Sequence, residues 1–157
     1  MESRIAMSVS LICLTEADTR AAGRRLASLL RPGDVVLLAG DLGSGKTVFA
    51  GGIGEGLGVD EPVISPSYIL SRRYEGLLPL VHADIYRLGS SAEIDDLDLL
   101  GDAADGVLVV EWGHAAEHAF GDEHLMVRIE VVEDGARRVD LEPHGQWRSR
   151  PLAEIAS

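Results

Sequence analysis

Short apolar runs, separated by turn residues, divide the chain into alternating predicted strands and helices. Residues 35–39 and 107–110 are apolar at every position, a pattern typical of strands buried on both faces of a parallel sheet. Further strands are predicted at residues 9–14, 68–74, 80–86, 125–132 and 137–141, the last two as a hairpin around Asp134-Gly135. This order predicts an α/β fold that has a mixed sheet with a parallel core flanked by helices.

Two longer helices are predicted beside the first strands. Thr15 is the N-cap of the first helix, acids follow in its first turn, and Pro32-Gly33 ends it. The second helix covers residues 46–57 although it contains four glycines, each of which costs about 1 kcal/mol relative to alanine. We interpret these glycines as places where a neighbouring element packs closely against bare backbone. Short helices are predicted within residues 91–104 and after Ser149.

The length of 157 residues predicts one domain over 1–157, with a core at 8–143 and a C-terminal tail at 144–157. No apolar run reaches the length of a membrane span, and the first residues lack a signal pattern. We therefore expect a soluble cytoplasmic protein with no membrane contact. The single cysteine, Cys13, is expected to be a small buried hydrophobe.

The formal net charge of −12 disfavours direct binding to a nucleic acid backbone, unless Arg72-Arg73 or Arg137-Arg138 forms a local basic patch. Such an acidic surface suits a basic protein partner.

A complete G-x-x-x-x-G-K-[ST] motif follows the first doubly buried strand and opens the glycine-bearing helix, which is the context that a phosphate-binding loop requires. Its residues are Gly40, Asp41, Leu42, Gly43, Ser44, Gly45, Lys46 and Thr47. Lys46 is the only lysine among the 14 basic residues of the chain. Its compact ammonium suits the position between two phosphates better than a planar guanidinium does. We expect the backbone from Leu42 to Thr47 to cradle phosphates, and the Thr47 hydroxyl to bind Mg²⁺.

Two carboxylates are candidates for the metal and for catalysis. Glu111 ends the second doubly buried strand, where it can reach Mg²⁺ or polarise the attacking water. Strand alternation places His82, Asp84 and Tyr86 on one face. Asp84 is expected to hold Mg²⁺ or to orient water.

Four motifs together resemble the TsaE family of bacterial P-loop ATPases. They are the loop at 40–47, Ser65-Pro66-Ser67-Tyr68, His82-Ala83-Asp84-Ile85-Tyr86-Arg87-Leu88, and Val110-Glu111-Trp112. The resemblance covers Thr15 to about Leu141 and implies the single-domain P-loop NTPase fold.

The resemblance also implies a function. It implies a protein that binds ATP and Mg²⁺, hydrolyses ATP slowly by itself, and works with TsaD and TsaB in threonylcarbamoylation of adenosine 37 in tRNAs that read ANN codons. The tRNA would be reached indirectly, through that complex. Catalysis would involve Lys46, Asp84 and Glu111.

For individual residues, the resemblance implies that Thr47, Glu111 and Asp84 contact the metal. It puts Ser67 in the loop that responds to the γ-phosphate, Trp112 beside the nucleotide, and Thr15 at its adenine end. The chain departs from the family at Ser67, where threonine is common, and at Gly51, where a basic residue is common.

Two other functions fit a phosphate-binding loop. A small-molecule kinase needs a mobile lid that carries arginine, whereas residues 90–105 are acidic and contain none. A nucleotide-responsive binding module would differ from the ATPase only in its rate of turnover.

Overall fold

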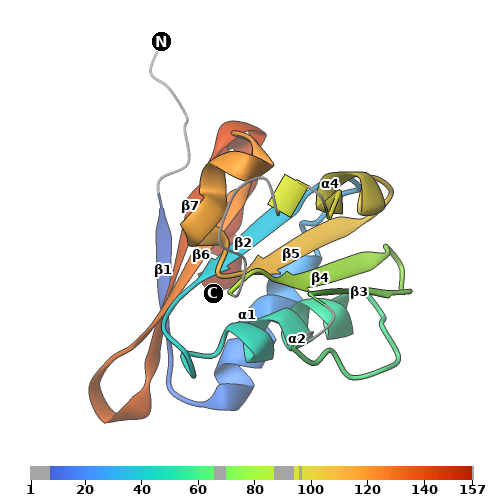
Figure 1. Cartoon of the computed structure of the whole chain (residues 1–157). Coiled ribbons are helices and arrows are strands. Elements are labelled where there is room, and N and C mark those ends of the chain that lie inside the picture. The colour runs from blue at the N-terminus through green and yellow to red at the C-terminus, as the bar shows by residue number, and fades with distance from the viewer. Residues whose placement is uncertain (1–7, 66–69, 87–93, 96, 157) are drawn as a thin grey trace.

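The computed structural model describes residues 8–65, 70–86, 94–95 and 97–156, and seven strands within these ranges form one mixed sheet (Figure 1). In spatial order the strands are β1 (Val9–Cys13), β7 (Arg137–Pro143), β6 (Leu125–Val131), β2 (Val35–Ala39), β5 (Val107–Glu111), β4 (Leu80–Asp84) and β3 (Ser71–Tyr74). The four central strands, β6 to β4, run parallel, and the outer strands pair antiparallel with their neighbours. The predicted mixed sheet with a parallel core is confirmed.

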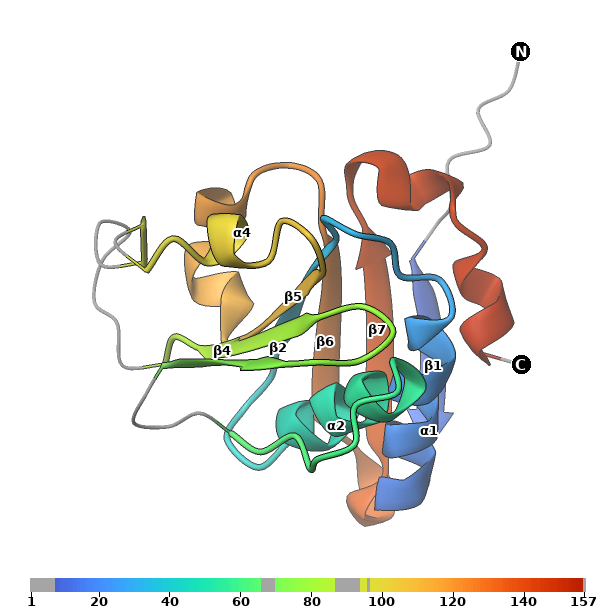
Figure 2. The same ribbon diagram turned by 90° about the vertical axis from the view of Figure 1, so that its right-hand side faces the viewer.

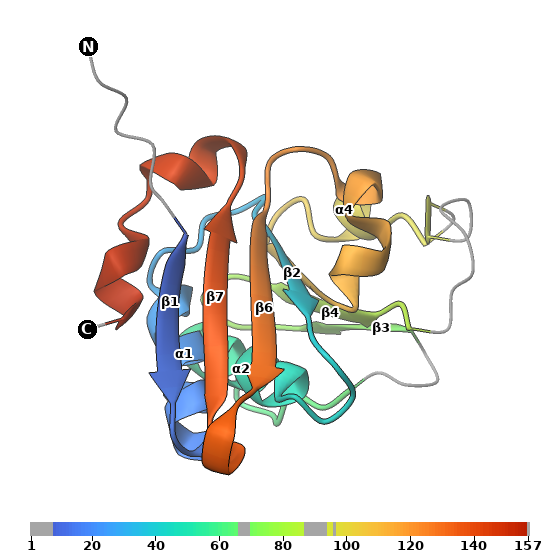
Figure 3. The ribbon, with the colours of Figure 1, turned by 90° about the vertical axis from the view of Figure 1, so that its left-hand side faces the viewer.

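The sheet is the middle of three layers. Helices α1 (Glu16–Ala27) and α2 (Lys46–Gly56) cover one face, and α4 (Leu99–Asp102) and the 3₁₀ helix η1 (Gly113–Phe120) cover the other (Figures 2 and 3). Alternate residues of β2 point into different cores, Val36 and Leu38 on the α1–α2 side and Val35 and Leu37 on the α4 side. This double burial explains the unbroken apolar run that the sequence shows.

Within the described residues, β3 begins at Ser71 and β4 ends at Asp84, inside the predicted ranges 68–74 and 80–86, and residues 68 and 69 lie outside the described part of the chain. Leu70 has a φ of +66°, which ends the extended backbone just before β3. Strand β4 ends at Asp84, because its partner β5 also ends at that register, opposite Glu111. The hairpin of β6 and β7 is confirmed, with the turn η2 (Glu133–Gly135) between them.

Gly52 and Gly56 allow α2 to lie directly against α1, in agreement with the close packing that the sequence predicts. A Cβ at Gly52 would lie 2.0 Å from the carbonyl oxygen of Arg20, and one at Gly56 would lie 2.4 Å from the Cβ of Ala27. Both are far inside van der Waals contact. The space beside Gly51, by contrast, holds only the end of the Arg20 side chain, whose guanidinium pairs with Glu55.

The segment after β7 packs into the main core. It forms two 3₁₀ helices, η3 (Gly145–Ser149) and η4 (Leu152–Ala156), and Trp147 is 1% exposed. Arg150 makes a buried two-pronged ion pair with Asp34, at 2.5 and 2.8 Å, and its guanidinium stacks on Trp147.

No helix in the described part of the chain combines the length and apolar character needed to cross a bilayer.

Candidate nucleotide site

The phosphate-binding loop joins the carboxyl end of the central strand β2 to the first turn of α2. Gly45, which precedes α2, has a φ of +115°, a value that residues with a Cβ rarely adopt. A Cβ at Gly40 would lie 2.4 Å from the carbonyl oxygen of Ile129 on β6. Glycine at these positions lets the chain turn tightly, so the free backbone N–H groups of the α2 amino terminus border the turn.

Lys46 is buried at the start of α2, with 4% of its surface exposed. Its Nζ donates to the backbone carbonyls of Gly40 at 2.7 Å and Asp41 at 3.0 Å. Burial lowers the pKa of the Lys46 ammonium, and the negative charges of Glu111 and Asp84 partly offset this effect. A phosphate would offer this ammonium stronger, charge-assisted hydrogen bonds than the two carbonyls do.

Trp112 forms an aromatic wall beside Lys46. It follows β5 directly and has a φ of +66°, an unusual conformation for a bulky residue and one found often at functional sites. The Lys46 Nζ lies 4.0 Å from the centre of the Trp112 ring, within range of a cation–π interaction. The Tyr86 ring lies 4.6 Å from the Trp112 ring, centre to centre, so two aromatic rings meet at this wall.

Glu111 is held by contacts from two directions. The Thr47 hydroxyl lies 2.9 and 3.1 Å from the two carboxylate oxygens of Glu111, and His82 Nε2 lies 2.7 Å from one of them. Glu111 and His82 are 3% and 0% exposed. The histidine donates to the carboxylate from strand β4, and Thr47 contacts the same carboxylate from the loop. The buried His82 ring therefore supports the Glu111 carboxylate from inside the fold.

Asp84 lies beside Glu111 because the two residues are register partners at the carboxyl ends of β4 and β5. One Asp84 oxygen accepts a hydrogen bond from the Ser65 hydroxyl at 3.2 Å, and the other accepts one from the Tyr86 backbone N–H at 3.0 Å. Parallel strands thus bring together two carboxylates that are 27 residues apart in the sequence.

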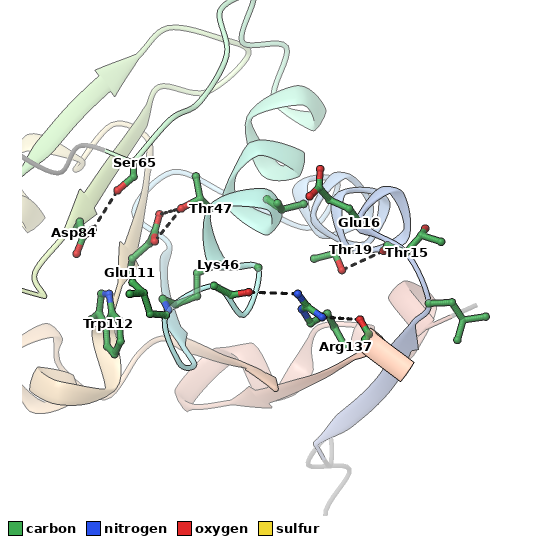
Figure 4. Close-up of a pocket in the computed structure, with 16 residues that line it drawn as sticks. Thr15, Glu16, Thr19, Lys46, Thr47, Ser65, Asp84, Glu111, Trp112 and Arg137 are labelled. Carbon is green, nitrogen blue, oxygen red and sulfur yellow. Dashed lines mark hydrogen bonds between the residues drawn. The ribbon is translucent and has the colours of Figure 1, made fainter. Parts of the chain in front are cut away.

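Helix α1 and the β6–β7 hairpin close the other side of the loop (Figure 4). Thr15 forms a capping box with Asp18, and Thr19 lies one helical turn further on the same side. Arg137 Nε donates to the Ser44 carbonyl at 2.6 Å and Nη2 to the Gly43 carbonyl at 3.3 Å. The guanidinium therefore anchors the loop to β7.

The loop, helix α1, the ends of β4 and β5, and the β6–β7 hairpin line one cleft of about 420 Å³. Its lining includes nine predicted site residues: Thr15, Leu42, Gly43, Gly45, Lys46, Thr47, Asp84, Glu111 and Trp112. Asp41 and Ser44 line a separate, smaller hollow on the β6 side of the loop. Ser67 lies outside the described residues.

The sequence indicated no ligand role for three residues that line the cleft, Glu16, Thr19 and Arg137. The helical spacing from Thr15 could have indicated Thr19, but no local pattern indicates Arg137.

The oxygen atoms in the cleft fit a magnesium ion. The Thr47 hydroxyl and the carboxylates of Glu111 and Asp84 are the hard ligands that Mg²⁺ prefers. The cleft therefore combines a loop suited to phosphates, a buried ammonium and a set of oxygen ligands on adjacent strands.

The fold and the cleft together define an α/β protein whose central strand leads through a phosphate-binding loop into a helix. The family model described as "Threonylcarbamoyl adenosine biosynthesis protein TsaE" matches residues 13–139, and the chain belongs to this family.

Relatives and a solved structure agree with this membership. The tRNA threonylcarbamoyladenosine biosynthesis protein TsaE of Streptomyces coelicolor is 48% identical, over 87% of this chain and 99% of the relative. The protein of the same name from Mycobacterium leprae is 44% identical, over 92% of this chain and 96% of the relative. The crystal structure of Bacillus subtilis YdiB is similar with a TM-score of 0.80 and 30% identity, covering 98% of this chain and 97% of that one.

Proposed function

We propose that this protein is a Mg²⁺-dependent ATPase that supports formation of the threonylcarbamoyl group on adenosine 37 of tRNAs reading ANN codons. The contact between Thr47 and Glu111 carries the ATPase part of the proposal, because it joins the hydroxyl of the phosphate-binding loop to a buried strand-end carboxylate. The name of the family, and of the relatives from Streptomyces and Mycobacterium, supports the role in tRNA modification.

The proposal gives specific roles to several residues in and behind the cleft. Lys46 leaves the loop carbonyls and contacts the β- and γ-phosphates, while the loop backbone binds the same phosphates. Thr47, with Glu111 or Asp84, would hold Mg²⁺, which when bound neutralises charge that develops on the phosphates. The other carboxylate orients the attacking water, and His82 keeps Glu111 in position. Thr15 and Thr19 border the part of the cleft left for the base and sugar.

The charge of the protein supports an indirect route to tRNA. A net charge of −12 repels a phosphate backbone. We therefore propose that the chain acts with the TsaD and TsaB proteins, that their presence accelerates its ATP hydrolysis, and that the tRNA is bound by the complex.

Phosphate release from Mg²⁺-ATP, measured for the chain alone and with the TsaD–TsaB pair, tests the proposal. We expect slow release alone and a clear increase with the pair, together with modified tRNA when the remaining substrates are supplied. An unchanged rate with the pair would contradict the coupling. Transfer of the γ-phosphate to a small molecule, instead of release as free phosphate, would indicate a kinase.

A further inference from the structure

Two histidines and a glutamate gather at the end of the sheet opposite the cleft. His124 precedes β6 and His144 follows β7, and the His144 backbone N–H donates to the His124 carbonyl at 3.0 Å. These strand ends lie side by side at one end of the hairpin (Figure 3). Glu117 comes from η1, which connects β5 to β6. Because β6 runs parallel to β2, its start lies far from the carboxyl end of β2 that bears the phosphate-binding loop.

The atoms of this group that can bind a metal converge. His124 Nε2 lies 2.7 Å from Glu117 Oε2, and His144 Nε2 lies 3.7 Å from the same oxygen. One ligand atom from each of the three residues lies within 4.8 Å of the others. In a tetrahedral zinc site with bonds of about 2.0–2.2 Å, ligand atoms are roughly 3.3 Å apart. The two observed separations lie on either side of that value.

The surroundings of His124 suit a metal ligand. The side chain is 3% exposed, and its Nδ1 lies 3.0 Å from the carbonyl oxygen of Gly121. Because a carbonyl only accepts hydrogen bonds, Nδ1 donates to it. Nε2, which donates to Glu117 in the metal-free protein, is the atom that would bind the ion after losing its hydrogen. Metal-bound histidines commonly make this second contact to a carbonyl or carboxylate. His144 stacks on His124 with ring centres 4.4 Å apart and is 35% exposed, so its ring has room to turn.

We propose that Glu117, His124 and His144 form a binding site for one transition-metal ion of the Zn²⁺ type. Two imidazoles and one carboxylate favour Zn²⁺, Co²⁺ or Ni²⁺ over Mg²⁺, which prefers oxygen ligands alone. The surrounding hollow leaves a fourth position open. A bound ion ties η1 to both strands of the β6–β7 hairpin, and η1 is the segment that directly follows Trp112.

Metal titration of the untagged full chain, after treatment with EDTA, tests this site. We expect calorimetry to show one Zn²⁺ ion per chain, and Co²⁺ to develop the visible absorption bands of a tetrahedral complex. Millimolar Mg²⁺ leaves both signals unchanged. Zn²⁺ also raises the unfolding temperature, because it binds the folded state preferentially.

Matched variants separate the site from general charge effects. His144→Ala and Glu117→Gln are expected to weaken Zn²⁺ binding about 100-fold or more and to abolish the Co²⁺ bands. Glu142→Gln removes one negative charge from the same end of β7 without removing a ligand, so it should bind as the natural chain does. Circular dichroism checks that each metal-free variant is folded. The proposal is overturned if the natural chain gives no Co²⁺ bands, or if His144→Ala binds Zn²⁺ as tightly as Glu142→Gln.

Discussion

The amino end of α2 borders the open cleft, whereas Gly52 and Gly56, further along the helix, are pressed against α1. In the cleft, Lys46 and Thr47 bond to carbonyls and a carboxylate that a bound nucleotide and its metal can replace as partners. At Gly52 and Gly56, by contrast, the α2 backbone lies so close to α1 that there is no room for a Cβ. One short helix therefore combines exchangeable polar contacts with fixed packing. We expect changes on the glycine side to alter stability, and changes in the cleft to alter ATP affinity or turnover.

The largest effect is expected for Gly52→Ala. The new Cβ would lie 2.0 Å from the backbone oxygen of Arg20, so the two helices must move apart. We expect the free energy of unfolding to fall by about 3 kcal/mol or more, measured by urea denaturation.

Gly51→Ala is the matched control for this prediction. Its Cβ would meet only the end of the flexible Arg20 side chain, at 2.9 Å. Stability should stay unchanged or rise by up to about 1 kcal/mol, because alanine favours the helix. Equal losses in Gly51→Ala and Gly52→Ala would show that close packing against α1 is not the reason for the glycines.

Lys46→Ala is expected to weaken ATP binding about 100-fold or more, because the charge-assisted contacts to two phosphates are lost. Its loss of stability should be smaller than that of Gly52→Ala. Calorimetry measures the affinity, and Arg148→Ala, which removes an exposed positive charge, should bind ATP normally. Unchanged affinity in Lys46→Ala would refute the assignment of the loop.

Glu111→Gln and Asp84→Asn are expected to lower ATP turnover about 100-fold while sparing most of the ATP affinity. Each amide keeps the size of the carboxylate but loses the charge that holds Mg²⁺ or activates water. Phosphate release at saturating Mg²⁺-ATP, compared with calorimetric affinity, separates the two effects. An affinity loss as large as that of Lys46→Ala would assign the carboxylates to binding instead of turnover.

A smaller effect is expected in fluorescence. We expect bound ATP to draw the Lys46 ammonium away from the Trp112 ring and so to change the emission of Trp112. Trp147 lies buried under Arg150 and should not respond. Trp147→Phe is therefore expected to keep the nucleotide-dependent signal and Trp112→Phe to lose it. The reverse result would show that the aromatic wall is not part of the nucleotide site.

The smallest effect concerns pH. Burial lowers the pKa of Lys46 below its ordinary value of 10.5 in the free protein, and bound phosphates would favour the charged form. At pH values below the lowered pKa the ammonium is charged in both states, so its titration leaves ATP affinity unchanged. As pH rises through the lowered pKa, binding must take up a proton and the affinity falls. Calorimetry at alkaline pH should show this fall, and Lys46→Arg should lack it, because arginine stays charged.

The sequence by itself determined the loop of the G-x-x-x-x-G-K-[ST] motif between a strand and a helix, the two doubly buried strands, the β6–β7 hairpin and the close packing of the α2 glycines. These features depend on local signals: continuous apolar runs, the turn at Asp134-Gly135, and a motif that fits within eight residues. Glu111 could also be indicated, because it ends a predicted strand, and so could Asp84, because it lies with other polar residues on one face of the predicted strand at 80–86. The parallel pairing of β4 and β5 brings the two carboxylates together, because the carboxyl ends of both strands lie at the same edge of the sheet.

Only the tertiary structure decided which distant groups surround these residues. Thr47 and Glu111 are 64 positions apart, and Arg137 reaches the loop from 93 positions away, so no local pattern records either contact. The strand order places β6 beside β2 and β4 beside β5. It brings Arg137 to the loop and buries His82 against Glu111, a contact that alternation along one strand does not predict. The same order places His124 beside His144 at the far end of the sheet. Local propensity selects strands, but long-range pairing and burial choose their neighbours.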